Sequence, residues 1–242
     1  MMEILKKMAA KAENNTDLPG VTLAFLGDSV TQGCFELPER ADGGFNNCHD
    51  RQHVYSAYVQ QILSVLYPTV PVNIINAGVA GKDAVHGLAR LERDVLSHGP
   101  DLTVVCFALN DSGNGEKGLG AYVDALGQIF DSLRNAGSEI IFMTPNTMAT
   151  HVSPLLKLPL FRELAEKFSR RQLEGGLDRY VEAAKNLCRS RNIPVCDCYA
   201  IWKKLEMSGV NTTELLANKL NHPTRQMHWM FAYELVRTML EA

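Results

Sequence analysis

Two residues far apart in the chain, a serine and a histidine, have side chains suited to nucleophilic catalysis. Ser29 lies in LGDSVTQG, directly after an apolar run. A serine between a strand and a helix is close to free N–H groups and to the positive end of the helix dipole, which suit an oxyanion. Asp28 and Ser29 could equally do no more than cap that helix. His222 precedes a proline that keeps it extended, and a neutral imidazole there could deprotonate Ser29.

Two further segments could supply hydrogen-bond donors to the same chemistry. NAGVAGKD, residues 76–83, contains glycines that permit positive φ angles and a close approach of the backbone to a ligand. FALNDSGNG, residues 107–115, contains Asn110, whose side-chain amide is an uncharged donor. Each segment taken alone is also typical of a turn. A catalytic role for either one depends on a fold that brings it to Ser29.

Apolar runs precede the Ser29 segment and the two donor segments, and they predict buried strands. The runs are continuous rather than alternating, as in strands that are buried on both faces. They begin at Val21, Pro71, Asp101, Ser138 and Ile193. Helical patterns lie at about 54–67, 85–97, 119–135, 177–191 and 227–240. This alternation predicts an α/β fold with a parallel sheet covered on both sides, in the flavodoxin-like strand order 2-1-3-4-5.

Functional groups on such a sheet gather beyond the carboxyl ends of the strands, so residues 28–33, 76–81, 108–113 and the loop after Met143 are expected to lie there. Two stretches are too long to be plain connections. Residues 34–53 are rich in Gly, Asn and charge, and they predict an elaborated loop that could wall a pocket. Residues 146–176 contain an amphipathic piece that predicts either a lid or a helix that contacts a partner. The second alternative would be compatible with a homo-oligomer. No repeat or linker divides the chain, which favours a single domain over 1–242.

The composition restricts the classes of partner. The net charge of -3 gives no electrostatic reason to expect nucleic acid or an anionic membrane. The N-terminal residues predict an amphipathic helix and not a signal peptide, and no apolar run is long enough to span a membrane. The six cysteines match no zinc pattern and need form no disulfide, which favours a reducing cytoplasm. His49 and His53 lack the glutamate of a zinc-protease motif, so neither a metal nor a cofactor is predicted.

Taken together and in this order, the four segments resemble the SGNH (GDSL-type) hydrolase family. Their shared features are GDS near the start, a glycine in the second block, Asn-Asp after the third strand and His-Pro near the end. The resemblance implies a three-layer α/β/α hydrolase that acts on esters, thioesters or acylated sugars. It implies that Ser29 is the nucleophile and His222 the general base. The Ser29 N–H, the Gly81 N–H and the Asn110 amide would form the oxyanion hole, with Gly81 preferred over Gly78 because GKD resembles the second block.

One position departs from the family pattern. The family usually has an aspartate three residues before the histidine, where it orients the imidazole, and this chain has Lys219 there. A lysine side chain can neither select the imidazole tautomer nor stabilise the imidazolium. The alternatives are a backbone carbonyl near Lys219, which is favoured and gives a Ser-His dyad, an amide of Asn218 or Asn221, or a remote acid such as Asp197 or Glu214.

These observations predict a serine esterase that hydrolyses small acyl esters, with acetyl esters of carbohydrates as the favoured small-molecule substrate. Polar residues in the first insertion and the lack of an evident apolar acyl tunnel support a small acyl group on a polar alcohol. Two alternatives are a lysophospholipase or thioesterase acting on longer acyl chains, and a non-catalytic carbohydrate-binding relative.

Overall fold

A parallel five-stranded sheet forms the centre of the computed structural model, which describes residues 1–242. The strands are β1 (Val21–Gly27), β2 (Val72–Gly78), β3 (Leu102–Cys106), β4 (Glu139–Met143) and β5 (Val195–Cys196). Their order in the sheet is β2-β1-β3-β4-β5, and every neighbouring pair is parallel, so the predicted fold class and strand order are confirmed. Every residue of the central strand β3 is buried, which accounts for its continuous apolar sequence.

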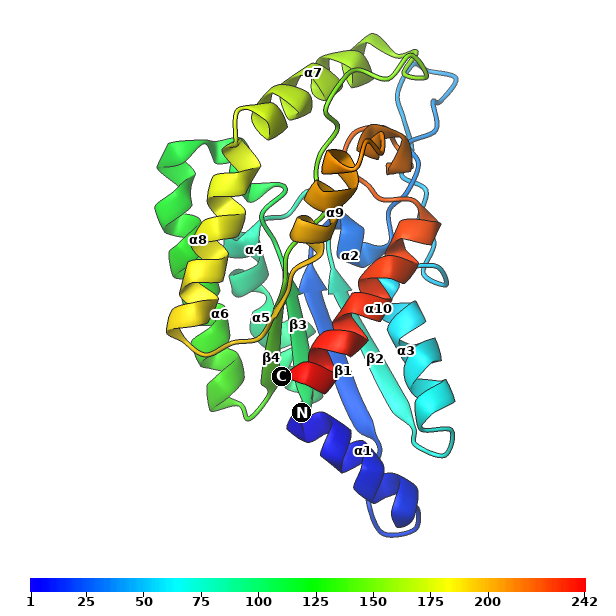
Figure 1. Cartoon of the computed structure of the whole chain (residues 1–242), viewed down its shortest axis with the longest axis vertical. Helices are drawn as coiled ribbons and strands as arrows, with labels where there is room; N and C mark the ends of the chain where they lie inside the picture. Colours follow the sequence, from blue (N-terminus) through cyan, green and yellow to red (C-terminus); the bar gives the residue numbers. More distant parts are fainter.

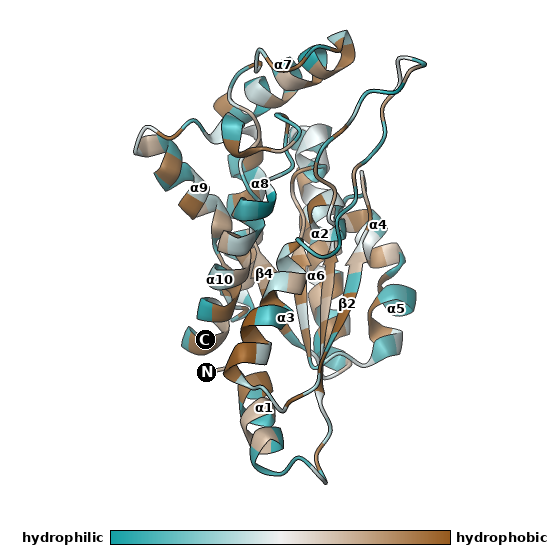
Figure 2. Ribbon diagram, turned by 90° about the vertical axis from the view of Figure 1, so that its right-hand side faces the viewer, coloured by the Kyte–Doolittle hydropathy of each residue, from teal (hydrophilic) through white to brown (hydrophobic).

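Helices cover both faces of the sheet (Figures 1 and 2). One face carries α1 (Glu3–Glu13), α3 (Tyr55–Leu66) and α10 (Arg225–Glu241), and the other carries α4 (Ala84–Ala89), α5 (Leu91–Asp94), α6 (Leu119–Asn135) and α8 (Gly176–Ser190). The remaining α-helices are α2 (Ser29–Gln32), α7 (Pro159–Leu173) and α9 (Cys198–Met207). Short 3-10 turns lie at Leu96–His98, Asp111–Asn114, Glu116–Gly118 and Thr212–Leu215. None of these helices combines the length and the apolar character needed to cross a membrane.

The helix expected at 85–97 is broken, and a buried arginine lies at the break. Arg90 lies between α4 and α5, and its guanidinium donates to Ala77 O at 2.6 Å and to Gly27 O at 2.9 Å. These carbonyls lie at the ends of β2 and β1. Arg90 therefore ties the helical segment to the strand ends that precede the candidate site, a contact between distant residues that helical periodicity cannot reveal.

Both predicted insertions lie above the carboxyl edge of the sheet. Residues 34–53 form a long loop that rises beside the end of β2, and α7 crosses the top of the molecule (Figure 2). The helix α7 belongs to a small apolar cluster that is separate from the main core, formed by Leu156, Phe161, Ala165 and Leu220. Leu220 lies in the loop before α10. The two insertions and the His222 loop therefore surround the same edge of the sheet.

Candidate active site

Ser29 is the first residue of α2 and follows β1 after a single residue. Asp28 caps this helix, since its Oδ1 accepts the Val30 N–H at 2.9 Å. A Cβ atom added to Gly78 would lie 2.2 Å from the Gln32 nitrogen, so the end of β2 packs directly against α2 and requires glycine there. Ser29 itself is only 5% exposed. Its hydroxyl is therefore presented by a short helix that is tightly packed on two strand ends.

The fold brings His222 to Ser29, although 193 residues separate them in sequence. His222 Nε2 lies 3.0 Å from Ser29 Oγ, and His222 Nδ1 lies 3.1 Å from the backbone oxygen of Phe35. A carbonyl oxygen can only accept, so Nδ1 carries the proton and donates it to Phe35. Nε2 then has a free lone pair and accepts the hydrogen bond of the Ser29 hydroxyl. This is the tautomer that a general base for Ser29 requires.

The surroundings of His222 favour its neutral form. Burial lowers the pKa of this imidazole to about 4, although the hydrogen bond to Phe35 O acts in the opposite direction. The proximity of His49 lowers the pKa of His222 further. At neutral pH the imidazole is therefore uncharged and able to take a proton.

The groups expected to orient His222 lie elsewhere. The Lys219 ammonium donates to Glu214 O at 2.8 Å and pairs with the Glu214 carboxylate at 3.0 Å, so neither side chain bonds to the imidazole. Asn218 acts on the backbone instead, because its Oδ1 accepts the His222 N–H at 2.9 Å. Asp197 caps α9 and pairs with Lys185. The expectation of a backbone carbonyl near Lys219 is corrected to the carbonyl of Phe35, in the first insertion.

Gly81 and Asn110 lie on the same cavity as Ser29 and His222. Gly81 has a φ of +72°, which favours glycine, and a Cβ added to it would meet nothing within 4 Å. Its N–H has no partner within the protein. The Asn110 amide donates to Lys82 O at 3.0 Å, and its second N–H is available to a ligand. Gly78, by contrast, packs beneath α2, so its environment differs from that of Gly81.

The cavity has a volume of about 360 Å³ and a mixed lining. Its polar lining includes Ser29, Asn110 and His222, and Asn47 of the first insertion adds an amide. The apolar part of the wall is formed by Leu37, Phe45, Leu164, Phe168 and Leu220. Residues 34–53 and α7 therefore both wall the pocket, and they make it less polar than the sequence of the first insertion suggests.

Two buried carboxyl groups lie at the adjoining strand ends. Burial raises the pKa of Asp28 to about 7 against the hydrogen bond from Val30 N–H, and Asp111 raises it further. Burial also raises the pKa of Asp111 to about 6, although Asp111 accepts the Ala84 N–H at 2.8 Å. Protonation of either group removes negative charge from the neighbourhood of Ser29. The local charge of the site therefore changes between about pH 6 and pH 7.

Each of the four segments that resemble the SGNH family contributes a residue to the lining of this cavity, and a family comparison decides the relationship. The family model of GDSL-like lipases and acylhydrolases matches residues 25–230. The chain belongs to this family. The match extends from the end of β1 into α10, so it includes β2 to β5 and all four segments.

Individual proteins that are similar to the chain include two acetyl esterases. An acetylxylan esterase from Geobacillus stearothermophilus is 32% identical over 92 residues, which are 38% of this chain and 40% of that esterase. The solved structure of Axe2, an acetylxylan esterase from Geobacillus stearothermophilus, superposes with a TM-score of 0.66 at 21% identity, covering 91% of this chain and 94% of that chain. A two-domain esterase active on acetylated mannans gives a TM-score of 0.65 at 19% identity, covering 98% of this chain and 52% of that chain. At these identities the two structural matches establish the shared fold.

Sequence reasoning misses the Phe35 carbonyl, which accepts a hydrogen bond from the His222 ring. Every residue has a backbone carbonyl, so no residue type marks this one. Arg225, three residues after His222, does leave a signal. It is the first residue of α10, where the helix dipole disfavours a cation, and this position suggests that acidic partners lie nearby.

Proposed function

We propose that the chain is a serine esterase that works through a Ser29–His222 dyad. The observation that carries this proposal is the chain of contacts from Ser29 Oγ through the His222 ring to Phe35 O. In this arrangement His222 Nε2 faces the Ser29 hydroxyl as an acceptor, and the hydrogen bond from Nδ1 to Phe35 O supports the tautomer that a general base needs. The family to which the chain belongs supports ester hydrolysis as the reaction class.

In the proposed reaction Ser29 Oγ attacks the acyl carbon while His222 Nε2 takes the hydroxyl proton. The negative charge on the former carbonyl oxygen is stabilised by the N–H groups of Ser29 and Gly81 and by the Asn110 amide. The intermediate collapses, the bond to the alcohol breaks, and His222 gives its proton to the departing oxygen. Water then attacks the acyl-enzyme with His222 again as base, which releases the acid and restores Ser29.

We propose a small acyl group, acetyl in the first instance, on a carbohydrate alcohol. The acetylxylan esterase relative and the acetylated-mannan esterase of similar fold support this choice. The apolar wall of Leu37, Phe45, Leu164, Phe168 and Leu220 favours one alternative, an enzyme for longer acyl chains. Such a wall could hold either an alkyl chain or the apolar face of a sugar ring, so the acyl length has to be measured.

The test compares p-nitrophenyl acetate with the octanoate for wild type and Ser29→Ala, together with labelling by a fluorophosphonate probe. We expect acetate to be preferred, and both hydrolysis and labelling to be lost in Ser29→Ala. A clear preference for octanoate would favour the long-chain alternative. Full activity in Ser29→Ala would exclude this serine as nucleophile, and a wild type without activity or labelling would favour a non-catalytic carbohydrate-binding protein.

A further inference from the structure

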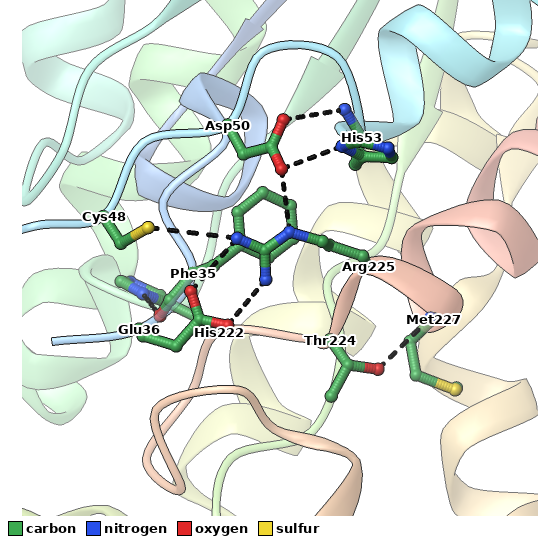
Figure 3. Close-up of polar contacts among 9 residues, drawn as sticks. All are labelled: Phe35, Glu36, Cys48, Asp50, His53, His222, Thr224, Arg225 and Met227. Atoms are coloured by element: carbon green, nitrogen blue, oxygen red, sulfur yellow. Dashed lines mark hydrogen bonds and ion pairs between the residues drawn. The ribbon is translucent and has the colours of Figure 1, made fainter. Parts of the chain in front are cut away.

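A cluster of polar contacts lies directly behind the carbonyl that holds His222 (Figure 3). The guanidinium of Arg225 lies over the Phe35 ring, with its central carbon 4.3 Å from the ring centroid. The same guanidinium bonds to both carboxylate oxygens of Glu36, at 2.6 and 3.2 Å, and to Asp50 at 2.8 Å. We call Phe35, Glu36, Asp50 and Arg225 the Arg225 cluster. It joins the first turn of α10 to the insertion that carries the Phe35 carbonyl.

Electrostatics explains why an arginine occupies this place. A cation at the first position of a helix opposes the helix dipole, so Arg225 needs nearby negative charge. The hydrogen bonds from Arg225 lower the pKa of Glu36. Burial by itself would raise the pKa of Asp50, but hydrogen bonds from Arg225 and His53 lower it to about 2. Both partners are therefore ionised at neutral pH, and the planar guanidinium is held by three charge-assisted hydrogen bonds.

Two residues of the same helical turn contact the Phe35 ring. Arg225 covers the ring, and His228, three residues further along α10, lies 4.9 Å from it between ring centroids. His228 is itself anchored, since its Nδ1 accepts the Tyr55 N–H at 3.1 Å. Phe35 is fully buried.

The backbone around Phe35 is also fixed. The Phe35 N–H donates to Cys48 O and the Cys48 N–H donates to Glu36 O, each at 2.9 Å. The Phe35 carbonyl lies in the peptide unit between the ring that Arg225 covers and the Glu36 residue that Arg225 binds. The direction of this carbonyl therefore depends on the two residues that the guanidinium holds.

We propose that Arg225 is a positioning residue for catalysis: by holding Phe35 and Glu36, it keeps the Phe35 carbonyl against His222 Nδ1–H and so maintains the tautomer that serves Ser29. This inference rests on the proposed Ser29–His222 dyad. It assigns to a backbone carbonyl and the nearby Arg225 the orienting role that an aspartate at the position of Lys219 usually has in the family.

The test compares three variants with wild type. Arg225→Met keeps the length of the side chain but removes the charge and the planar fork. Arg225→Lys keeps the charge but not the bidentate geometry. Arg237→Met is the matched control, because Arg237 lies on the same helix and pairs with Glu234 and Glu241 away from the site. We expect kcat to fall about 10- to 100-fold in Arg225→Met with KM within about threefold, since small misplacements of a catalytic group cost this much. Arg225→Lys should fall between Arg225→Met and wild type, and Arg237→Met should match wild type.

A second measurement separates positioning from a general loss of structure. In protein labelled with ¹⁵N-histidine, the His222 resonances report which ring nitrogen carries the proton, and His222→Ala identifies them. We expect a single Nδ1–H tautomer in wild type and a mixture of tautomers in Arg225→Met. If Arg225→Met does not fold, Glu36→Gln weakens the same contact in a residue that is partly exposed, and it should show the same changes to a smaller extent.

The outcomes distinguish this inference from the proposed function. An unchanged kcat or an unchanged tautomer in Arg225→Met, with Ser29→Ala inactive, would overturn the role of Arg225 alone. An active Ser29→Ala would overturn the dyad, and the tautomer measurement would still decide whether Arg225 orients His222.

Discussion

The most direct consequence of the site geometry concerns the pH profile of kcat/KM, whose acidic limb should lie at an unusually low pH. His222 must be neutral to accept the Ser29 proton, so activity falls as the pH drops through the pKa of this imidazole. Burial without a carboxylate partner places this pKa at about 4, against about 6.5 for an ordinary histidine. The difference corresponds to about 3 kcal/mol by which the site disfavours the imidazolium. We therefore expect kcat/KM to change little from His222 ionisation between pH 7 and pH 5, and to fall tenfold per pH unit below about pH 4.

The assay is the hydrolysis of p-nitrophenyl acetate between about pH 3.5 and 8, followed at a wavelength where the absorbance of nitrophenol does not depend on its ionisation. Circular dichroism at each pH, and recovery of activity after return to pH 7, separate titration from unfolding. Asp28 titrates at about pH 7, so an inflection there has a different origin. Asp28→Asn keeps a side chain that can cap α2 and should remove only that inflection. An acidic limb near pH 6.5 that persists in both Asp28→Asn and Asp111→Asn would refute the conclusion that the His222 imidazole is desolvated and lacks an acidic partner.

Two further expectations concern a donor and a buried base. Asn110→Ala should lower kcat about 10²- to 10³-fold with little change in KM, because one oxyanion donor is lost. The control is Asn114→Ala, at an exposed residue, which should match wild type. Equal kinetics for both variants would show that Asn110 is not part of the oxyanion hole. His228 is fully buried, and burial lowers its pKa to about 3. Below pH 6.5 the unfolded chain therefore binds a proton at this histidine that the folded chain does not bind. The free energy of unfolding should then fall on acidification by up to about 1.4 kcal/mol per pH unit. Urea unfolding at pH 7 and pH 5 should show a shallower decrease for His228→Phe than for wild type, and equal decreases would contradict this assignment.

Local pattern was sufficient to predict much of the framework. The continuous apolar runs predicted the five strands because both faces of a covered parallel sheet are buried. Each strand needs apolar residues on both faces whichever strands lie beside it. The helix expected at 85–97 is instead broken at Arg90, whose guanidinium bonds to carbonyls at the ends of β1 and β2. The helix α9 was missed as well. Helical periodicity gives no information about such contacts between distant residues.

The sequence by itself determined that Ser29, Gly81, Asn110 and His222 would meet. Each of the first three follows a parallel strand, and the carboxyl ends of parallel strands share one edge of the sheet. The resemblance to the SGNH family added His222 and favoured Gly81 over Gly78. Strand order and that resemblance together therefore predicted this part of the site.

Only the tertiary structure decided what holds His222. The partner is a backbone carbonyl 187 residues away, and a carbonyl is common to every residue, so no residue type could mark it. The direction of that carbonyl depends on Arg225, Glu36 and Asp50, which come together only when the first insertion packs on α10. The lysine at position 219 showed that an acid was missing from its expected place, and long-range packing determined what took over its role.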